Sequence, residues 1–171
     1  MTTTTIAAPS ASAPSRAPAN AGKAILVAWL LAGTCDILSA FAHSMAYGGT
    51  PLGVLRAVAS GLIGQRAKGG GWDIGMLGLF LHFFIMLGFV LAFRAASRKL
   101  TFMLKEPLIV GPLYGIAVFL FMNGIVLPLS AIVFAPSYDF ATVAIGMCIH
   151  MLAVGTMIAS TFYYFLGREA G

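Results

Sequence analysis

Four long apolar stretches dominate the sequence, at about residues 24–47, 73–95, 108–134 and 140–166. Each stretch meets the requirement of roughly 20 mostly apolar residues for a helix that crosses a bilayer. The first stretch is too long for the apolar core of a cleaved signal peptide, so we expect it to remain as a span. The pattern predicts an all-α fold: a polytopic membrane four-helix bundle.

The loop between the first two spans has a helical pattern of its own. Thr50 followed by Pro51 is typical of an N-cap and the first position of a helix. The apolar positions that follow fall on one helical stripe: Leu52, Leu55, Val58 and Leu62. We therefore predict an additional short amphipathic helix at about residues 51–66 in this first (outer) loop, lying along the interface or capping the bundle.

Residues 1–22 differ in composition from the rest of the chain. They are mostly Thr, Ala, Pro and Ser and contain no apolar run, so they cannot bury a core. We predict a disordered N-terminal tail over residues 1–22 and one four-span membrane domain over residues 23–167.

Composition agrees with a membrane protein and argues against a soluble one. Charged residues make up 9% of the chain and its mean hydropathy is +0.95, whereas soluble domains carry about 25% charged residues. The net charge of +5 comes from basic residues scattered over loops and helix ends, which does not indicate nucleic-acid binding. Seven of the ten Lys and Arg residues lie in the tail, the middle loop or the C-terminus, which predicts cytoplasmic termini.

Each predicted span carries one polar side chain near its middle. These residues are Asp36, His82, Asn123 and His150, which the helical rise places roughly 13 to 16 Å below the outer end of each span. An ionisable group in hydrocarbon is costly, so such residues usually face the bundle interior and often mark function. His43 is shallower and shares a helix face with Asp36, which extends a polar stripe outward.

The third span contains two further features of interest. Gly111 and Gly115 form a GxxxG pair, which serves either a contact within the chain or a dimer. Pro128 removes a backbone hydrogen bond, so we expect a kink just beyond Asn123.

Three interpretations of the polar layer remain open. It is a structural hydrogen-bond network, a path for protons, ions or a small solute, or a metal or haem centre. For the last, Asp36 and two histidines are candidate transition-metal ligands, and His82 and His150 are candidate axial ligands of haem b. No catalytic motif occurs in the sequence, which favours a non-enzymatic protein and assigns no catalytic residue.

Short blocks along the chain also resemble a known family. The blocks are GTCDILSAFAH, TPLGVLRAVASGLIG, LGLFLHFFI, GPLYGIAVFLFMNGIVLPLS and HMLAVGTMIA. Together they resemble an uncharacterised family of small bacterial four-span inner-membrane proteins, over nearly everything after the tail. The resemblance implies four spans and the bacterial cytoplasmic (inner) membrane, and it implies no activity.

The sequence thus favours an integral membrane protein that binds or conducts a small solute or protons through its polar layer. The residues expected to bind or relay are Asp36, His43, His82, Asn123 and His150. A non-catalytic scaffold or assembly partner, and a haem- or metal-binding redox subunit, are the alternatives. The expected partners are the lipid bilayer and either a second copy of the chain or a larger membrane complex.

Overall fold

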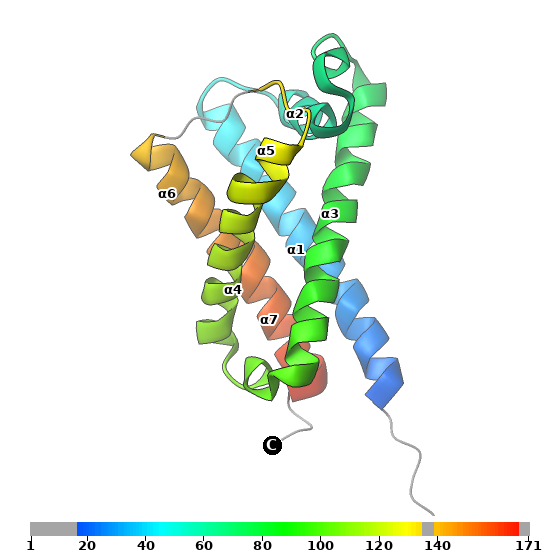
Figure 1. Cartoon of the computed structure of the whole chain (residues 1–171), viewed down its shortest axis with the longest axis vertical. Helices are drawn as coiled ribbons and strands as arrows, with labels where there is room; N and C mark the ends of the chain where they lie inside the picture. The colour runs from blue at the N-terminus through cyan, green and yellow to red at the C-terminus, as the bar shows by residue number, and fades with distance from the viewer. Residues whose placement is uncertain (1–16, 135–138, 168–171) are drawn as a thin grey trace, which may run out of the picture.

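The computed structural model describes residues 17–134 and 139–167, and every regular element among them is helical. The all-α prediction is therefore confirmed. Four helices are long and apolar enough to cross a membrane: Asn20–Ala46, Trp72–Lys99, Pro107–Leu129 and Phe140–Gly167. These correspond to the four stretches expected from hydropathy, and they form one bundle (Figure 1).

The first two long helices are regular, whereas the third and fourth change their winding. α1 spans Ala17–Ala46 and α3 spans Trp72–Lys99. The third long helix consists of three consecutive elements: α4 (Pro107–Phe121), the π-helical η3 (Met122–Val126) and α5 (Leu127–Leu129). The fourth long helix consists of four consecutive elements: α6 (Phe140–Ile149), the π-helical η4 (His150–Thr156), α7 (Met157–Phe162) and the π-helical η5 (Tyr163–Gly167).

The beginning of α1 and the end of η5 lie at the same end of the bundle, as Figure 1 shows. The 3₁₀ turn η2 (Thr101–Leu104) joins α3 to α4 at this end too, while α2 and the chain beyond α5 lie at the other. We call these the terminal end and the α2 end. Helix α1 contacts both α3 and α7, and α4 packs most extensively against η4, whereas the backbones of α3 and α4 scarcely approach each other.

Hydropathy placed the start of the first helix too late. Residues 1–16 of the predicted tail lie outside the described residues, but Ala17–Gly22 form the opening turns of α1. The tail prediction was therefore wrong for residues 17–22. Alanine favours helix, and Ala17, Ala19 and Ala21 let the helix extend beyond its apolar part.

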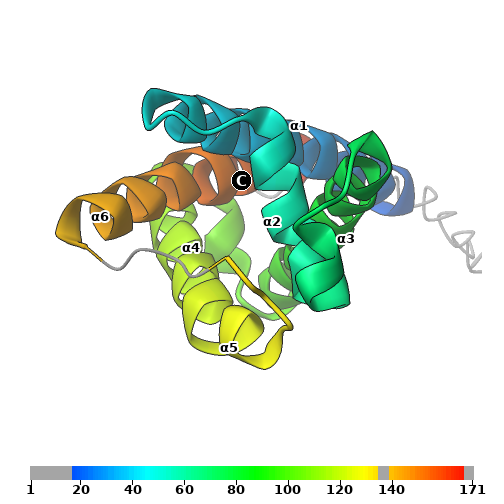
Figure 2. The ribbon, with the colours of Figure 1, turned by 90° about the horizontal axis from the view of Figure 1, so that it is seen from above.

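The short helix in the first loop is confirmed as α2 (Pro51–Ile63), followed by the 3₁₀ turn η1 (Gly64–Ala67). Thr50 caps it as predicted, because its Oγ1 accepts a hydrogen bond from the Gly53 N–H at 3.0 Å. Leu55 is buried, but Leu62, the last position of the predicted stripe, is 62% exposed. Seen from above, α2 crosses the end of the bundle beside α1 and α3 (Figure 2).

Helix α2 sits directly on α3 because two glycines there leave room for it. A Cβ at Gly78 would overlap the backbone carbonyl of Leu55, and one at Gly75 would lie 2.9 Å from Leu52 Cδ1. These two glycines therefore accommodate α2 rather than another long helix. Helix α2 covers the bundle by backbone contact, and Arg56 Nη1 adds a hydrogen bond of 2.9 Å to the Gly70 carbonyl just before α3.

The third long helix ends earlier than hydropathy predicted. It stops at Leu129, and residues 130–134 are not helical. Instead, the Ala131 N–H donates to the Gly61 carbonyl at 2.9 Å, and the Val133 N–H donates to Ser60 Oγ at 3.4 Å. The apolar residues 131–134 thus bind α2 rather than extend the helix, and the α2 end of the bundle is closed by both segments.

The GxxxG pair in α4 makes a contact within the chain. A Cβ at Gly111 would lie 2.6 Å from Thr156 Cα, and one at Gly115 would overlap the His150 carbonyl. Gly155 makes the same contact from the fourth long helix, since a Cβ there would overlap the Gly111 carbonyl and lie 2.5 Å from Gly115 N. Three glycines on two helices therefore allow backbones to touch, which brings His150 close to α4.

The core in the half of the bundle near the terminal end is apolar. Small residues of α1, one turn apart, face larger side chains of α3 and α7. The fully buried residues of this apolar core are Ala24, Ala28, Ala32, Val90, Phe93, Val154, Ile158, Ala159 and Phe162. Phe93 and Phe162 have ring centroids 5.3 Å apart. This layer separates the terminal end from everything nearer to α2.

Candidate functional site

Three of the four polar residues singled out by the sequence line one small cavity. Asp36 comes from α1, His82 from α3 and His150 from the start of η4, and the cavity has a volume of about 80 Å³. The rest of its lining is apolar: Val58, Ile85, Met86, Phe89, Val118, Met122 and Val154. The cavity is large enough for a few water molecules and offers them an acid and two imidazoles.

His82 is held in a fixed orientation by α1. Its Nε2 lies 2.9 Å from the backbone carbonyl oxygen of Gly33. One turn away, the Trp29 Nε1–H donates to the Phe83 carbonyl at 2.7 Å, so each helix donates one side-chain hydrogen bond to the other's backbone. Gly33 permits this approach, because a Cβ there would lie 2.6 Å from Phe83 Cε1.

The Gly33 contact decides the tautomer of His82. A carbonyl oxygen can only accept a hydrogen bond, so His82 Nε2 must carry the hydrogen. The other ring nitrogen, Nδ1, lies 4.0 Å from Asp36 Oδ2, and the two side chains are only 10% and 16% exposed. A neutral His82 therefore turns a lone pair toward the acid.

A proton at the pair would make this contact attractive. If Asp36 were ionised and His82 neutral, lone pairs of Oδ2 and Nδ1 would face each other in a poorly solvated site, which is unfavourable. The contact is attractive when either the carboxyl or Nδ1 carries a proton. The separation of 4.0 Å is within the range of an ion pair but longer than a direct hydrogen bond, so no short bond fixes that proton on one partner.

His150 lines the same cavity with the other tautomer. Its Nδ1 lies 2.8 Å from the carbonyl oxygen of Gly146, one turn earlier in the same helix, so Nδ1 carries the hydrogen. Nε2 is left to accept or to carry a second proton.

The cavity is closed toward both ends of the bundle. Toward the α2 end its lining includes Val58 of α2. Toward the terminal end the apolar core intervenes, where Val90, Phe93 and Ile158 have no exposed surface. Apolar side chains therefore border the cavity toward both ends of the bundle, whereas Asp36 and His82 keep 16% and 10% of their side-chain surface exposed.

Asn123 and His43 do not join the cavity. We expected four polar side chains to meet, and the structure brings three together. The Asn123 Nδ2–H donates to the carbonyl of Phe119 in its own helix at 2.9 Å, which satisfies one donor without reaching another helix. His43 packs beside Tyr47 with ring centroids 4.9 Å apart, and the Ser39 hydroxyl donates to the Cys35 carbonyl of its own helix.

Two π-helical segments border the cavity, and the sequence analysis did not predict π-helical winding there. η3 begins at Met122 and η4 begins at His150, and both residues line the cavity. Where Pro128 predicts a kink just beyond Asn123, the structure has the π-helical η3, which directly precedes Leu127 and Pro128. π-helical turns are rare and occur frequently at functional sites.

The geometry gives little support to the metal and haem interpretations. Within residues 17–134 and 139–167, no three His, Cys, Asp or Glu side chains are grouped closely enough to hold a metal ion. The space between His82 and His150 holds a few waters, which is too small for a porphyrin.

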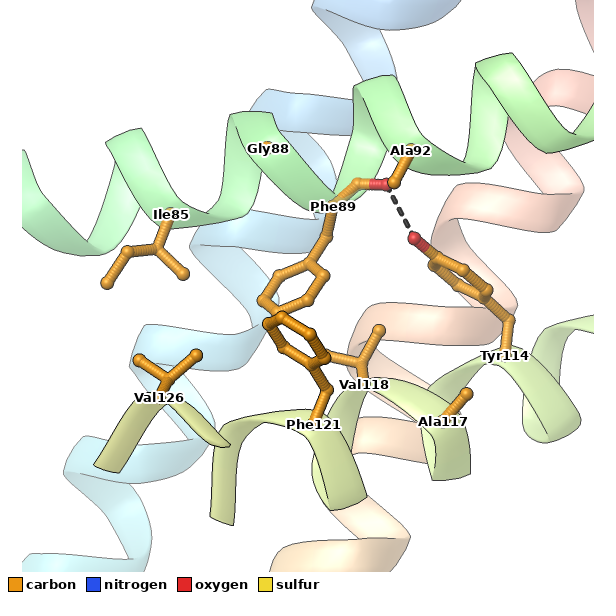
Figure 3. Close-up of a pocket in the computed structure, with 9 residues that line it drawn as sticks. All are labelled: Ile85, Gly88, Phe89, Ala92, Tyr114, Ala117, Val118, Phe121 and Val126. Atoms are coloured by element: carbon orange, nitrogen blue, oxygen red, sulfur yellow. Dashed lines mark hydrogen bonds between the residues drawn. The ribbon is translucent and has the colours of Figure 1, made fainter. Parts of the chain in front are cut away.

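Beside the polar cavity, a larger apolar groove opens between α3 and α4, where the two backbones diverge. It has a volume of about 420 Å³ and is shown in Figure 3. The rings of Phe89 and Phe121 meet across it, edge to face, with centroids 5.9 Å apart. The Tyr114 hydroxyl donates to the Phe89 carbonyl at 2.6 Å, which fastens α4 to α3 at one end of the groove.

Comparison of the chain with protein-family models, with curated proteins and with solved structures found no match.

Proposed function

We propose that this chain is a multi-pass membrane protein that takes up and releases protons at an occluded site formed by Asp36 and His82 beside His150. Through this site it binds or conducts a small solute or protons. The observation that carries the proposal is the His82 Nε2 contact with the Gly33 carbonyl at 2.9 Å. It turns the Nδ1 lone pair to Asp36, so the acid and the imidazole are placed to share a proton.

The placement of the site favours a gated mechanism. A channel would need a continuous polar path, but the cavity is closed by Val58 on one side and by the apolar core on the other. A carrier that exposes its site alternately to the two ends requires such an occluded state. The π-helical turns η3 and η4 are the positions where the third and fourth helices depart from regular winding next to the site, so we assign the motion to them.

A structural role is the second candidate, and one observation favours it. Trp29 and His82 each link a side chain of one helix to the backbone of the other, so part of the polar layer holds α1 and α3 in register. A carboxyl is not needed for that purpose, because neither of these two hydrogen bonds involves Asp36. This scaffold function predicts that an amide at position 36 would serve equally well.

The membrane setting belongs to the same proposal. The four long helices have lengths and hydropathies suitable for spanning, and both ends of the described chain lie at one end of the bundle. Lys23, Arg94, Arg98, Lys99 and Lys105 are on or beside elements of that end. We place this end in the cytoplasm of a bacterial cell and the α2 end outside it, in accord with the positive-inside rule.

Proton flux into liposomes that contain a trapped pH dye tests the function. Under an inward proton gradient, the wild-type protein should acidify the lumen faster than empty liposomes, and Asp36→Asn should abolish the difference. Asp73→Asn is the matched control, because Asp73 is an exposed carboxylate in the first turn of α3. Equal rates for wild type and Asp36→Asn would rule out a proton-transfer role and favour the scaffold.

A further inference from the structure

We propose that the cavity formed by Asp36, His82 and His150 binds ammonium, a small cation with N–H donors on all sides. This inference rests on the proposed function and deepens it, since it names the solute that competes with protons for the site. It concerns binding alone.

The polar groups of the cavity have acceptors to offer a guest. The hydrogen on His82 Nε2 goes to the Gly33 carbonyl at 2.9 Å, and the hydrogen on His150 Nδ1 goes to the Gly146 carbonyl at 2.8 Å. When both imidazoles are neutral, each retains one ring nitrogen with a free lone pair, and an ionised Asp36 also only accepts. Among the described residues that line the cavity, the polar side chains in this state offer three acceptors and no donor.

This state of the site carries one negative charge, and the chain supplies no positive charge to balance it. Asp36 and His82 are only 16% and 10% exposed, so water screens the charge weakly. No lysine or arginine is among the described residues that line the cavity, and its remaining lining is apolar. The counter-charge must therefore come from a proton or from a bound cation.

The separation of Asp36 and His82 suits a donor held between them. Oδ2 and Nδ1 lie 4.0 Å apart, which is too long for a direct hydrogen bond. One nitrogen that donates to two acceptors at about 2.8 Å each, with its N–H bonds at roughly 90–110°, holds those acceptors about 4.0–4.6 Å apart. Ammonium can thus bridge the two lone pairs that otherwise face each other. A water molecule can bridge them too, but it brings no charge.

The volume of the cavity limits the size of the cation. Its volume of about 80 Å³ corresponds to two or three waters at about 30 Å³ each. Ammonium is similar in size to water and fits together with one or two waters. Methylammonium adds one methyl group, which the apolar part of the lining accommodates, whereas a bulky amine such as tert-butylammonium does not fit.

The same groups disfavour other classes of ligand. An anion would meet only acceptors. Hard metal cations such as Mg²⁺ and Ca²⁺ take about six or more oxygen ligands, whereas the carbonyls of Gly33 and Gly146 already accept from the histidines. Within the part of the chain that the structure describes, no three side chains are grouped closely enough to hold a transition metal. A small cation that binds by donating hydrogen bonds remains.

Equilibrium binding of ¹⁴C-labelled methylammonium to the protein in lipid nanodiscs tests the proposal. Nanodiscs enclose no lumen, so a pH gradient cannot concentrate the amine. We expect saturable binding that ammonium displaces at least about tenfold better than K⁺ or tert-butylammonium does. K⁺ is the decisive competitor, because it matches ammonium in charge and closely in size but donates no hydrogen bond. This comparison uses the unaltered protein, so it does not depend on the folding of a variant.

Two histidine substitutions give a matched pair. His150→Phe removes one acceptor from the cavity and keeps an aromatic ring beside Phe119, whose centroid lies 5.4 Å from that of the imidazole. We expect it to weaken methylammonium binding by about tenfold. His43→Phe is the control, because His43 packs beside Tyr47 and does not line the cavity, and it should leave binding within about twofold. Size-exclusion profiles and thermal midpoints establish that both variants fold.

The outcomes separate this inference from the function on which it rests. Absence of saturable methylammonium binding, equal displacement by K⁺ and ammonium, or equal effects of the two histidine variants would overturn the ammonium assignment. In those cases, proton flux that still depends on Asp36 would leave the proposed function intact. Ammonium-selective binding that Asp36→Asn weakens by at least about tenfold and Asp73→Asn leaves unchanged would support the assignment, whether or not proton flux is observed.

Discussion

His82 on α3 donates its Nε2–H to the backbone carbonyl of Gly33 on α1, across 2.9 Å. This bond has two effects. It holds the imidazole in one orientation, and it leaves Nδ1 as the nitrogen that faces Asp36. The glycine contributes by its lack of a side chain, because the same position on α1 meets the ring of Phe83.

Gly33→Ala should therefore disturb both stability and the site. The added Cβ would lie 2.6 Å from Phe83 Cε1 and 2.9 Å from Cδ1, so the ring or the helix must shift. Overpacking of this kind costs about 1–3 kcal/mol. We expect a lower free energy of unfolding in mixed micelles titrated with SDS, together with reduced proton flux.

Gly22→Ala is the matched control on the same helix, because a Cβ there meets nothing within 4 Å. Alanine is the better helix former, so this variant should be neutral or slightly stabilising, by up to about 1 kcal/mol. If both variants behaved alike, the close approach of α1 and α3 at Gly33 would be refuted.

Gly155→Ala should separate the third and fourth helices. The Cβ would overlap the Gly111 carbonyl, and backbone atoms cannot move aside as a side chain can. We expect the free energy of unfolding to fall by about 1–3 kcal/mol or more. Gly124→Ala, in the third helix with nothing within 4 Å of its Cβ, is the control and should leave unfolding nearly unchanged. Equal stability of the two variants would contradict the glycine contact.

A cysteine pair can test the closure at the α2 end. A Cβ at Gly61 would lie 3.7 Å from Ser130 Cβ, which is close to the mean Cβ separation of about 3.8 Å in disulfides. Gly61→Cys with Ser130→Cys, in a background without Cys35 and Cys148, should form a disulfide in air, detected by thiol titration. Leu62→Cys with Ser130→Cys should remain reduced, because the Leu62 side chain is largely exposed. Failure of the first pair to oxidise would place α2 elsewhere.

The fold could be predicted from the sequence further than the site could. Long apolar stretches and the Thr50-Pro51 cap are local signals, and they located four long helices and α2 correctly. Helix ends were less certain, since the chain after Leu129 binds α2 through contacts with Gly61 that no local pattern contains. Depth along a span was informative as well, because it put Asp36, His82 and His150 at one level.

The sequence did not predict how each helix is rotated about its own axis. Asn123 has a depth similar to that of His82, but its side chain donates within its own helix to Phe119. Hydropathy does not contain this information, because it follows from how η3 is wound. π-helical turns such as η3 and η4 depend on packing against other helices, including the contact of Gly115 with His150. Depth along the spans therefore indicated three of the side chains that line the cavity, but not the orientation of any of them.

The ¹⁵N NMR spectrum of ring-labelled histidine tests the central claim most directly, because the chain has only three histidines. The account predicts that His82 carries its hydrogen on Nε2 and His150 on Nδ1, and that the His82 Nδ1 resonance shifts in Asp36→Asn but not in Asp73→Asn. A His82 with the hydrogen on Nδ1 alone and a bare Nε2, or an Nδ1 resonance unaffected by Asp36→Asn, would contradict a proton held between Asp36 and His82.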